Sequence, residues 1–244
     1  MSAGTAVSAS TALRARLRLT APAVRSATSA MWRSPGLGPR YGGYLAAMHG
    51  VIRASVPLME RAVLRCAEVG PAEGVFGPAD PVCGPLAEYL RGHIEEERGH
   101  DDWLLADIAA LGGDPAAVLD RQPPPVVARL AGAQHYWIEY HHPVALLGYI
   151  AVLEGNAPAP WLADLIAAAG VPEAALRTVR GHAELDTGHT AALFALLDEL
   201  PLDPPLVNAV VMSALHTVDG LVELFAHIGR AAQQEHPRER THTS

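Results

Sequence analysis

The chain has 244 residues and a formal net charge of −8; half of it is hydrophobic and 18% is charged. This composition is typical of a folded globular domain, and the acidic net charge argues against nucleic acid as a partner. No uninterrupted apolar run reaches the roughly 18 residues of a membrane-spanning helix, so no membrane segment is expected. The two cysteines form no CxxC motif, which indicates reduced thiols and a cytoplasmic protein.

The start of the chain is basic, because no acidic residue precedes Glu60 whereas seven arginines do. We expect a flexible tail over residues 1–10, followed by basic helices near 10–19 and 22–32. The Gly- and Pro-rich stretch 34–39 ends the second helix. An organelle transit peptide is the alternative interpretation of such an Arg- and Ser-rich start.

Helical patterns fill the rest of the chain, and Gly- and Pro-rich segments separate them. Ala and Leu dominate, and no strand pattern of any length occurs. The sequence therefore predicts an all-α, single-domain helical bundle of about seven or more helices over 11–233, with a disordered tail over 234–244. The helices are expected at 41–68, 86–111, 125–140, 143–154, 159–169, 173–198 and 204–232.

Two similar octets, HIEEERGH at 93–100 and HAELDTGH at 182–189, stand out within this pattern. On an α-helix, residues at positions 0, 4 and 7 share a stripe about 60° wide. His182, Asp186 and His189 therefore lie on one face. Imidazoles and a carboxylate on the same helix as buried leucines would be costly without partners, and a metal ion supplies such partners.

A third feature is Glu154, a single carboxylate at the end of the uncharged helix segment 144–153. It either marks the end of the helix or points into the bundle as a ligand. Together with the octets it completes a set of carboxylates and imidazoles without thiolate, which suits iron or manganese. Helical bundles build two-metal carboxylate sites from such side chains. The set is Glu97, His100, Glu154, His182, Asp186 and His189.

The order E-x2-H, a lone Glu about fifty residues later and H-x3-D-x2-H resembles the haem-oxygenase-like diiron oxidases and oxygenases, the iron-containing redox enzymes. The segments EEERGHDDWLLADIAALG and PVALLGYIAVLEG carry the same resemblance, over residues 40–230 or so. It implies the haem-oxygenase-like helical fold and two ferrous ions per chain, with manganese as the alternative metal. It also implies that the six residues of the set are the metal ligands and that Glu97 or Glu154 bridges the ions.

The chain departs from this family at two positions. Some N-oxygenating members have a further carboxylate where this chain has Leu90, which lowers the expectation of N-oxygenation. The other is His93, which faces the site by helical periodicity. We expect it to orient the ligands from outside their inner shell, and the alternatives are an additional ligand or a base near the substrate. Glu96 competes with Glu97 by helical geometry, but the family register selects Glu97; Glu95 is expected to face solvent.

Other polar residues carry weaker functional hypotheses. Tyr136 and Tyr140 lie in a His-rich segment and could line a substrate channel, although an amphipathic helix end is the preferred explanation. Arg53 could pair with a substrate carboxylate or with a neighbouring helix. His216 either serves the pocket or forms a helix–helix hydrogen bond.

The resemblance implies an enzyme that uses O2 to oxidise a small molecule such as an amino acid, a fatty acid or a related carboxylate, in specialised metabolism. Three alternatives keep a helical fold. A haem oxygenase would need an axial histidine, for which His49 is the early candidate. A thiaminase-II-like hydrolase would need a nucleophilic cysteine, for which Cys66 and Cys83 lack a supporting pattern. The third is a non-enzymatic metal- or ligand-binding protein. A homodimer is common in proteins of this fold.

Overall fold

The computed structural model describes residues 7–33, 36–68 and 80–235, apart from the side chains of 33, 185–187 and 231–235. Within these residues the chain forms α-helices and two short 3-10 helices and no strand, so the all-α prediction is confirmed. The helices are α1 (Ala9–Arg33), α2 (Leu37–Glu68), α3 (Cys83–Glu97), α4 (His100–Ala110), α5 (Pro115–Asp120), α6 (Pro125–Tyr140), η1 (Pro143–Ala145), α7 (Leu146–Glu154), α8 (Pro160–Ala168), η2 (Glu173–Ala175), α9 (Arg177–Glu199) and α10 (Pro204–Glu235).

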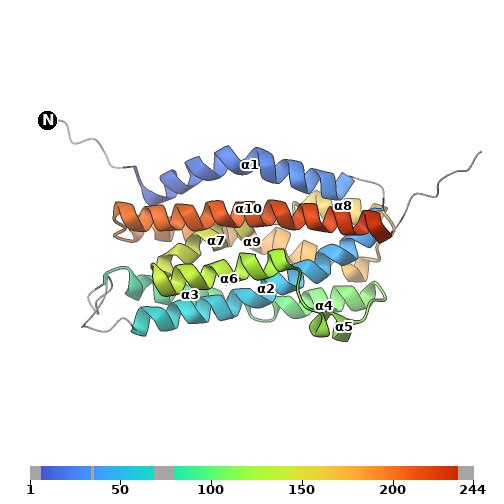
Figure 1. Cartoon of the computed structure of the whole chain (residues 1–244), viewed down its shortest axis with the longest axis horizontal. Coiled ribbons are helices and arrows are strands. Elements are labelled where there is room, and N and C mark those ends of the chain that lie inside the picture. The colour runs from blue at the N-terminus through green and yellow to red at the C-terminus, as the bar shows by residue number, and fades with distance from the viewer. Residues whose placement is uncertain (1–6, 34–35, 69–79, 236–244) are drawn as a thin grey trace, which may run out of the picture.

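The long helix α10 runs the length of the bundle and packs against α1, α2, α6 and α7 (Figure 1). By length and composition its segment Pro204–Arg230 could cross a membrane, which the sequence prediction did not anticipate. More than half of its most apolar window is buried inside the bundle. That burial is typical of a core helix, which passes the same test of length and composition.

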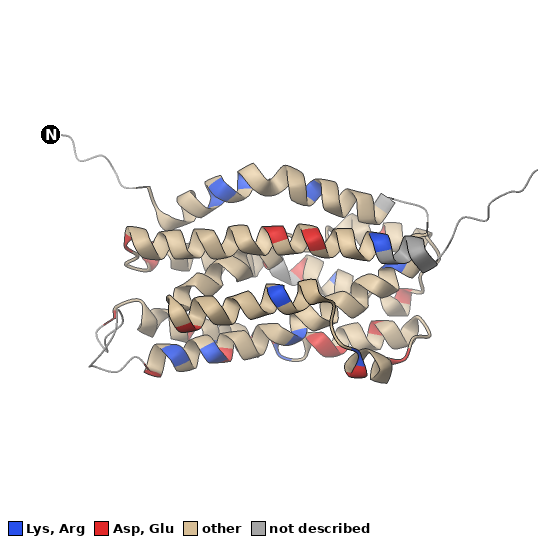
Figure 2. Ribbon diagram, in the orientation of Figure 1, with Lys and Arg blue, Asp and Glu red and all other residues tan. Residues whose placement is uncertain are grey.

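The prediction of two N-terminal helices is wrong, because α1 is continuous from Ala9 to Arg33 and contains Pro22. A proline inside a helix removes one backbone hydrogen bond. Here the helix packs along α10, and that packing offsets the loss. Figure 2 shows basic but no acidic residues on α1. The predicted tails overlap residues 1–6 and 236–244, which lie outside the described residues.

The predicted single helix over 86–111 is divided into α3 and α4 at Arg98 and Gly99. Arg98 is extended, and Gly99 has a φ of 86°, a conformation that glycine adopts without steric cost. The break falls between Glu97 and His100. The prediction placed Glu97 and His100 on one face of a continuous helix, and that register does not apply across the break. The turn at Arg98 and Gly99 brings the two side chains together instead.

Gly148 is where α7 passes closest to α10. A Cβ atom at Gly148 would lie 2.1 Å from the carbonyl oxygen of Val210 and 2.8 Å from the amide nitrogen of Ala214. Both are backbone atoms that cannot rotate away. The absence of a side chain at Gly148 therefore sets how closely α7, which ends at Glu154, approaches the core.

Candidate metal centre

The structure brings together the side chains of five of the six predicted ligands: Glu97, His100, Glu154, His182 and His189. They come from α3, α4, α7 and α9, and His93 and Glu96 of α3 join them. The sixth, Asp186, lies on α9 between His182 and His189, but its side chain is outside the described residues. The site is thus a convergence of four helices around buried carboxylates and imidazoles.

One group of donor atoms forms where α3 ends and α4 begins. His100 Nδ1 lies 3.2 Å from Glu97 Oε2, and the rings of His100 and His182 meet edge to face at 5.2 Å. One ligand atom each from Glu97, His100 and His182 lies within 4.8 Å of the others. This spacing allows one metal ion to contact all three.

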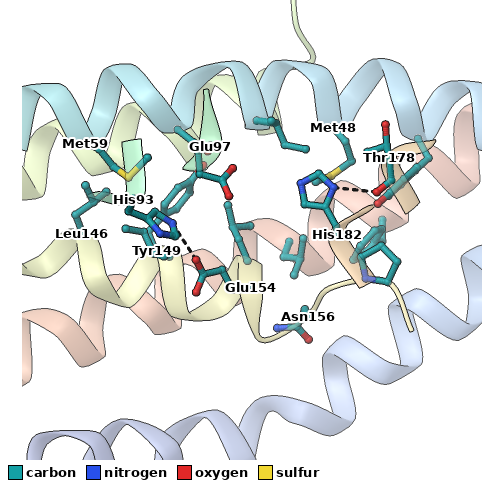
Figure 3. A pocket seen from close by; sticks show the side chains of 18 residues that line it. Met48, Met59, His93, Glu97, Leu146, Tyr149, Glu154, Asn156, Thr178 and His182 are labelled. Carbon is teal, nitrogen blue, oxygen red and sulfur yellow. Dashed lines mark hydrogen bonds and ion pairs between the residues drawn. The ribbon is translucent and has the colours of Figure 1, made fainter. Parts of the chain in front are cut away.

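A second group lies beside it and contains His93, Glu96 and His189. His189 Nε2 is 3.3 Å from Glu96 Oε2, and His93 Nε2 is 2.9 Å from Glu154 Oε1. The two groups touch, because His189 Nδ1 is 3.8 Å from Glu97 Oε1 and 3.7 Å from Glu154 Oε1. Figure 3 shows Glu97 between His93 and His182, with Glu154 turned toward His93. Glu97 thus lies between the two groups, whereas Glu154 contacts His93 and His189 of the second group.

The ring of His182 is oriented by the backbone of its own helix. Its Nδ1 lies 2.9 Å from the carbonyl oxygen of Thr178, which can only accept a hydrogen bond. Nδ1 therefore carries the proton, and Nε2 keeps its lone pair. A backbone carbonyl fixes the tautomer of metal-ligating histidines in the same way.

The electrostatics of the cluster favour charged carboxylates. Burial acts to raise the pKa of Glu97, but the hydrogen bond to His100 and the charges of His100, His93 and His182 outweigh burial and lower that pKa. Burial also acts to lower the pKa of His93, but Glu154, Glu97 and Glu96 outweigh it and raise that pKa. The pKa of His182 is lowered, chiefly by burial. These directions favour the ionised form of Glu97 and the neutral form of His182, which are the forms that bind a metal.

A cavity of about 90 Å³ opens beside this cluster. The cluster contributes His93, Glu97, Glu154 and His182 to its wall, and most of the remaining wall is apolar. The apolar part comes mainly from α2, α7 and α10: Tyr44, Met48, Ile52, Met59, Leu146, Tyr149, Ile150, Leu153, Leu221 and Phe225. Such a wall excludes water from the donors and suits an apolar portion of a small molecule.

The residues predicted to serve the substrate lie elsewhere. Tyr136 and Tyr140 are exposed, with 55% and 75% of their surface accessible, and their rings contact each other at a tilt along α6. His216 is exposed on α10, and Arg53 lines a different cavity. None of these four residues lines the cavity beside the cluster. Helical periodicity alone could not tell which face of α2, α6 or α10 meets the site.

Tyr89 is a site residue that the sequence interpretation missed. Its ring stacks on His93 with a centroid separation of 5.6 Å, and its buried hydroxyl has no hydrogen-bond partner among the described residues. Burial and the charges of Glu154, Glu96 and Glu97 raise the pKa of Tyr89. The signal in the sequence was its position one helical turn before His93.

Trp103 was missed as well. It lies on α4 one turn after His100, and its ring is 4.1 Å from the imidazole of that residue. A Cβ atom at Gly181 would come within 2.6 Å of Trp103, so the glycine lets the indole lie directly against α9 beside His182. Trp103 thus packs between two of the proposed ligands.

Asp107 connects α4 to the start of α9. Its carboxylate is fully buried and accepts hydrogen bonds from the backbone amides of Arg177 and Thr178, at 3.2 and 2.9 Å. These amides belong to the first turn of α9, where no residue of the same helix can accept from them. Asp107 therefore fixes the helix that carries His182 and His189.

Replacing Asp107 with Ala is expected to lower the free energy of unfolding by about 2–4 kcal/mol, because two buried amides lose a charged acceptor. The matched control is Asp114→Ala, which removes an exposed cap from the amide of Ala116 and should cost about 1 kcal/mol. Urea unfolding of both variants measures the difference. Equal losses would show that the Asp107 contacts do not fix α9.

A third group of donor side chains, Asp80, Cys83 and His142, lies outside the cavity. His142 Nδ1 accepts a hydrogen bond from the amide of Val144 at 3.0 Å. The proton of this histidine must then sit on Nε2, which faces Asp80 at 3.0 Å and Cys83 at 4.0 Å. His142 is therefore a hydrogen-bond donor there, the opposite of His182. This arrangement disfavours metal coordination.

The family of iron-containing redox enzymes matches residues 81–221, a segment that includes every proposed ligand. The chain belongs to this family. The family match and the imidazole–carboxylate cluster thus fall in the same part of the chain. No curated protein is similar enough to match the chain.

Two solved structures resemble the fold of this iron-containing redox enzyme. One is a domain of unknown function with a heme oxygenase-like fold from Shewanella denitrificans; the TM-score is 0.69 at 18% identity, covering 90% of this chain and 94% of that one. The other is a TenA homolog from Pseudomonas syringae pv. tomato, with a TM-score of 0.61 at 13% identity, covering 95% and 98%. At these identities the similarity shows the fold alone, and it confirms the predicted haem-oxygenase-like bundle.

Proposed function

We propose that this protein is a non-haem diiron oxidase or oxygenase that uses O2 to oxidise a small molecule. The observation that carries the proposal is the contact between two donor groups. Glu97, His100 and His182 would hold one iron, and His93, Glu96 and His189 would surround the other. Glu97 contacts residues of both groups and is the bridging candidate that these contacts favour, whereas Glu154 contacts only His93 and His189 of the second group. We therefore propose His93 as a ligand rather than as a residue that only orients the ligands.

Buried polar atoms without partners support the fit of metal ions. Glu154 Oε2 and His189 Nδ1 are buried and have no hydrogen-bond partner among the described residues. A buried polar atom left unpaired is costly, and a bound cation would remove that cost. Imidazole and carboxylate donors without thiolate suit iron, and manganese is the alternative.

Bound iron would supply the electrons that activate O2, and the chain would prepare the surroundings. Thr178 holds His182 in the metal-binding tautomer, and Asp107 fixes the helix on which it lies. The apolar wall from α2, α7 and α10 excludes water and holds the substrate beside the donors. Trp103 keeps His100 and His182 in place.

The substrate we propose is a small molecule with an apolar portion, of the class that includes amino acids, fatty acids and related carboxylates. The cavity of about 90 Å³ is smaller than the ordinary range of small-molecule sites, so a longer substrate requires the wall to open. Among the described residues no arginine lines this cavity, and Arg53 lines the other one, so Arg53 is not placed to provide the carboxylate clamp that the sequence suggested.

Two alternatives with the same fold make different demands on the cavity beside the cluster. A thiaminase-II-like hydrolase needs a cysteine at its cavity, but neither Cys66 nor Cys83 lines the cavity beside the cluster. A haem oxygenase would use His49, which lines a different cavity. Both leave the convergent imidazoles and carboxylates without a role.

The proposal is tested by adding ferrous iron to the metal-free protein without oxygen and measuring bound iron by elemental analysis. We expect close to two irons per chain, and O2 consumption that depends on iron when air and candidate substrates are admitted. The variant His182→Ala should lose iron, whereas His216→Ala, which removes an exposed histidine, should not. Equal iron binding by both variants would disprove the assignment. Iron uptake without O2 consumption would favour a metal-storage protein.

A further inference from the structure

Helix α2 separates two cavities. Met48 and Ile52 face the cavity beside the metal donors, whereas His49 and Arg53 line a second cavity of about 400 Å³. The members of each pair are four residues apart, so each pair occupies one face of the helix. The second cavity is bounded by α2, the segment around α5, the Pro-rich connection to α6 and part of α10. It shares no lining residue with the first.

The wall of the second cavity is cationic. Arg40, Arg53, Arg121 and His227 line it, and no aspartate or glutamate in the described part of the chain does. Among the described residues, Arg53 and Arg121 lie within ion-pair distance of no carboxylate. The chain as a whole is acidic, with a net charge of −8, so a cavity wall with only basic charged side chains among the described residues is not what the overall composition would predict.

His49 supplies a buried polar atom at this wall. Only 3% of the residue is exposed, and its Nε2 has no hydrogen-bond partner in the described part of the chain. Burial lowers the pKa of His49, as does Arg53, whereas Asp101 and Asp102 of α4 oppose the effect. The neutral ring has one N–H to donate, and nothing in the described protein accepts it at Nε2. A ligand that accepts hydrogen bonds would remove this deficit.

Small residues on α2 make room for a ligand. Gly42, Gly43 and Gly50 line the cavity, and a Cβ atom at Gly50 would lie 3.0 Å from Val127 Cγ1. On the opposite side, Val118 and Leu119 of α5 provide apolar surface. A volume of about 400 Å³ is within the ordinary range of small-molecule sites.

We propose that this second cavity binds a small organic anion whose carboxylate or phosphate group contacts Arg53, Arg121 and His49. Guanidinium groups pair with the oxygen atoms of such anions in a bidentate manner, and the imidazole N–H adds a directed hydrogen bond. The apolar side of the cavity holds the organic part of the ligand. This site is independent of iron, because it contains none of the proposed metal ligands.

The test is calorimetric titration of the full chain with two probes, inorganic phosphate and benzoate, at about 0.15 M ionic strength, where exposed charges are screened. Saturable binding of phosphate identifies a phosphate-type site, and saturable binding of benzoate identifies a carboxylate-type site. For the probe that binds, Arg53→Ala and Arg121→Ala should each weaken binding by about tenfold or more, the effect of losing one charged contact. If neither phosphate nor benzoate binds saturably, the proposal is overturned.

The matched control is Arg16→Ala, which removes an exposed arginine of α1 that lines neither cavity. It changes the net charge as the test variants do and should leave binding unchanged; equal weakening would show a general charge effect and overturn the site. Nitrogen-15 NMR of labelled histidines should show the His49 resonance shift on binding, with His49→Gln to assign it. An unmoved His49 resonance during saturable binding would also reject this geometry. Iron content, measured in parallel, should not change among these variants.

Discussion

Changing Glu97 to Gln is expected to weaken binding of both irons by more than about 100-fold, beyond the usual effect of altering a residue that only supports a ligand. The reason is position: Glu97 contacts His100 of one donor group and His189 of the other. The amide keeps the shape of the side chain but loses its charge. Elemental analysis after anaerobic loading, and the rise in melting temperature caused by iron, measure the loss.

Two neighbouring glutamates provide a matched series for this prediction. Glu96 lies 3.3 Å from His189 but is 59% exposed, so Glu96→Gln should affect at most one iron. Glu95 is 73% exposed and pairs with Arg98, so Glu95→Gln should leave iron binding unchanged. The loss of iron binding should therefore be largest for Glu97→Gln, smaller for Glu96→Gln and absent for Glu95→Gln. A larger loss with Glu96→Gln than with Glu97→Gln would show that the ligands are misassigned.

Gly148→Ala is expected to destabilise the fold by about 3 kcal/mol or more, at the upper end of the usual effect of overpacking. The added methyl group would meet the backbone of Val210 and Ala214, and relief requires α7 and α10 to separate. For a chain of this length the melting temperature should fall by about 6–12 °C. Because α7 ends at Glu154, the folded fraction should also bind less iron.

Gly132→Ala on α6 is the control for that substitution. A Cβ atom at Gly132 meets nothing within 4 Å, so alanine should stabilise the helix by about 0.5–1 kcal/mol through its better helix propensity. Thermal unfolding should therefore shift in opposite directions for the two variants. A fall in melting temperature of the same size in both would contradict the proposed role of the α7–α10 contact.

Much of the fold was predictable because helix formation depends on local patterns. The spacing of apolar residues and the Gly and Pro breaks placed α6, α7 and α10 within a few residues of their observed bounds. The errors occurred where packing overrode a local signal. Pro22 did not end α1, because the helix lies along α10, and the glycine at 99 ended α3 within a continuous helical pattern.

The donor set followed from residue type and spacing, since imidazoles and carboxylates beside apolar positions imply a shared partner. The role of His93 did not, because its distance from Glu154 depends on how α3 meets α7. Arg53 was expected at the substrate, but it lies on the face of α2 that lines the other cavity. Helical periodicity indicates which residues share a face of one helix. It does not indicate which other helix packs against that face, because that depends on the tertiary structure.

Helix periodicity and composition are local properties of the chain, so they were enough to predict an all-helical protein, and the order of donor residues was enough to show a resemblance to the iron-containing redox enzymes. The packing of the helices was needed to show that the donors form two touching groups with Glu97 between them, and that His182 and His142 hold opposite tautomers. Those features depend on distances of a few ångströms between atoms of different helices. Such distances are set by how the helices pack, through contacts such as Gly148 against α10.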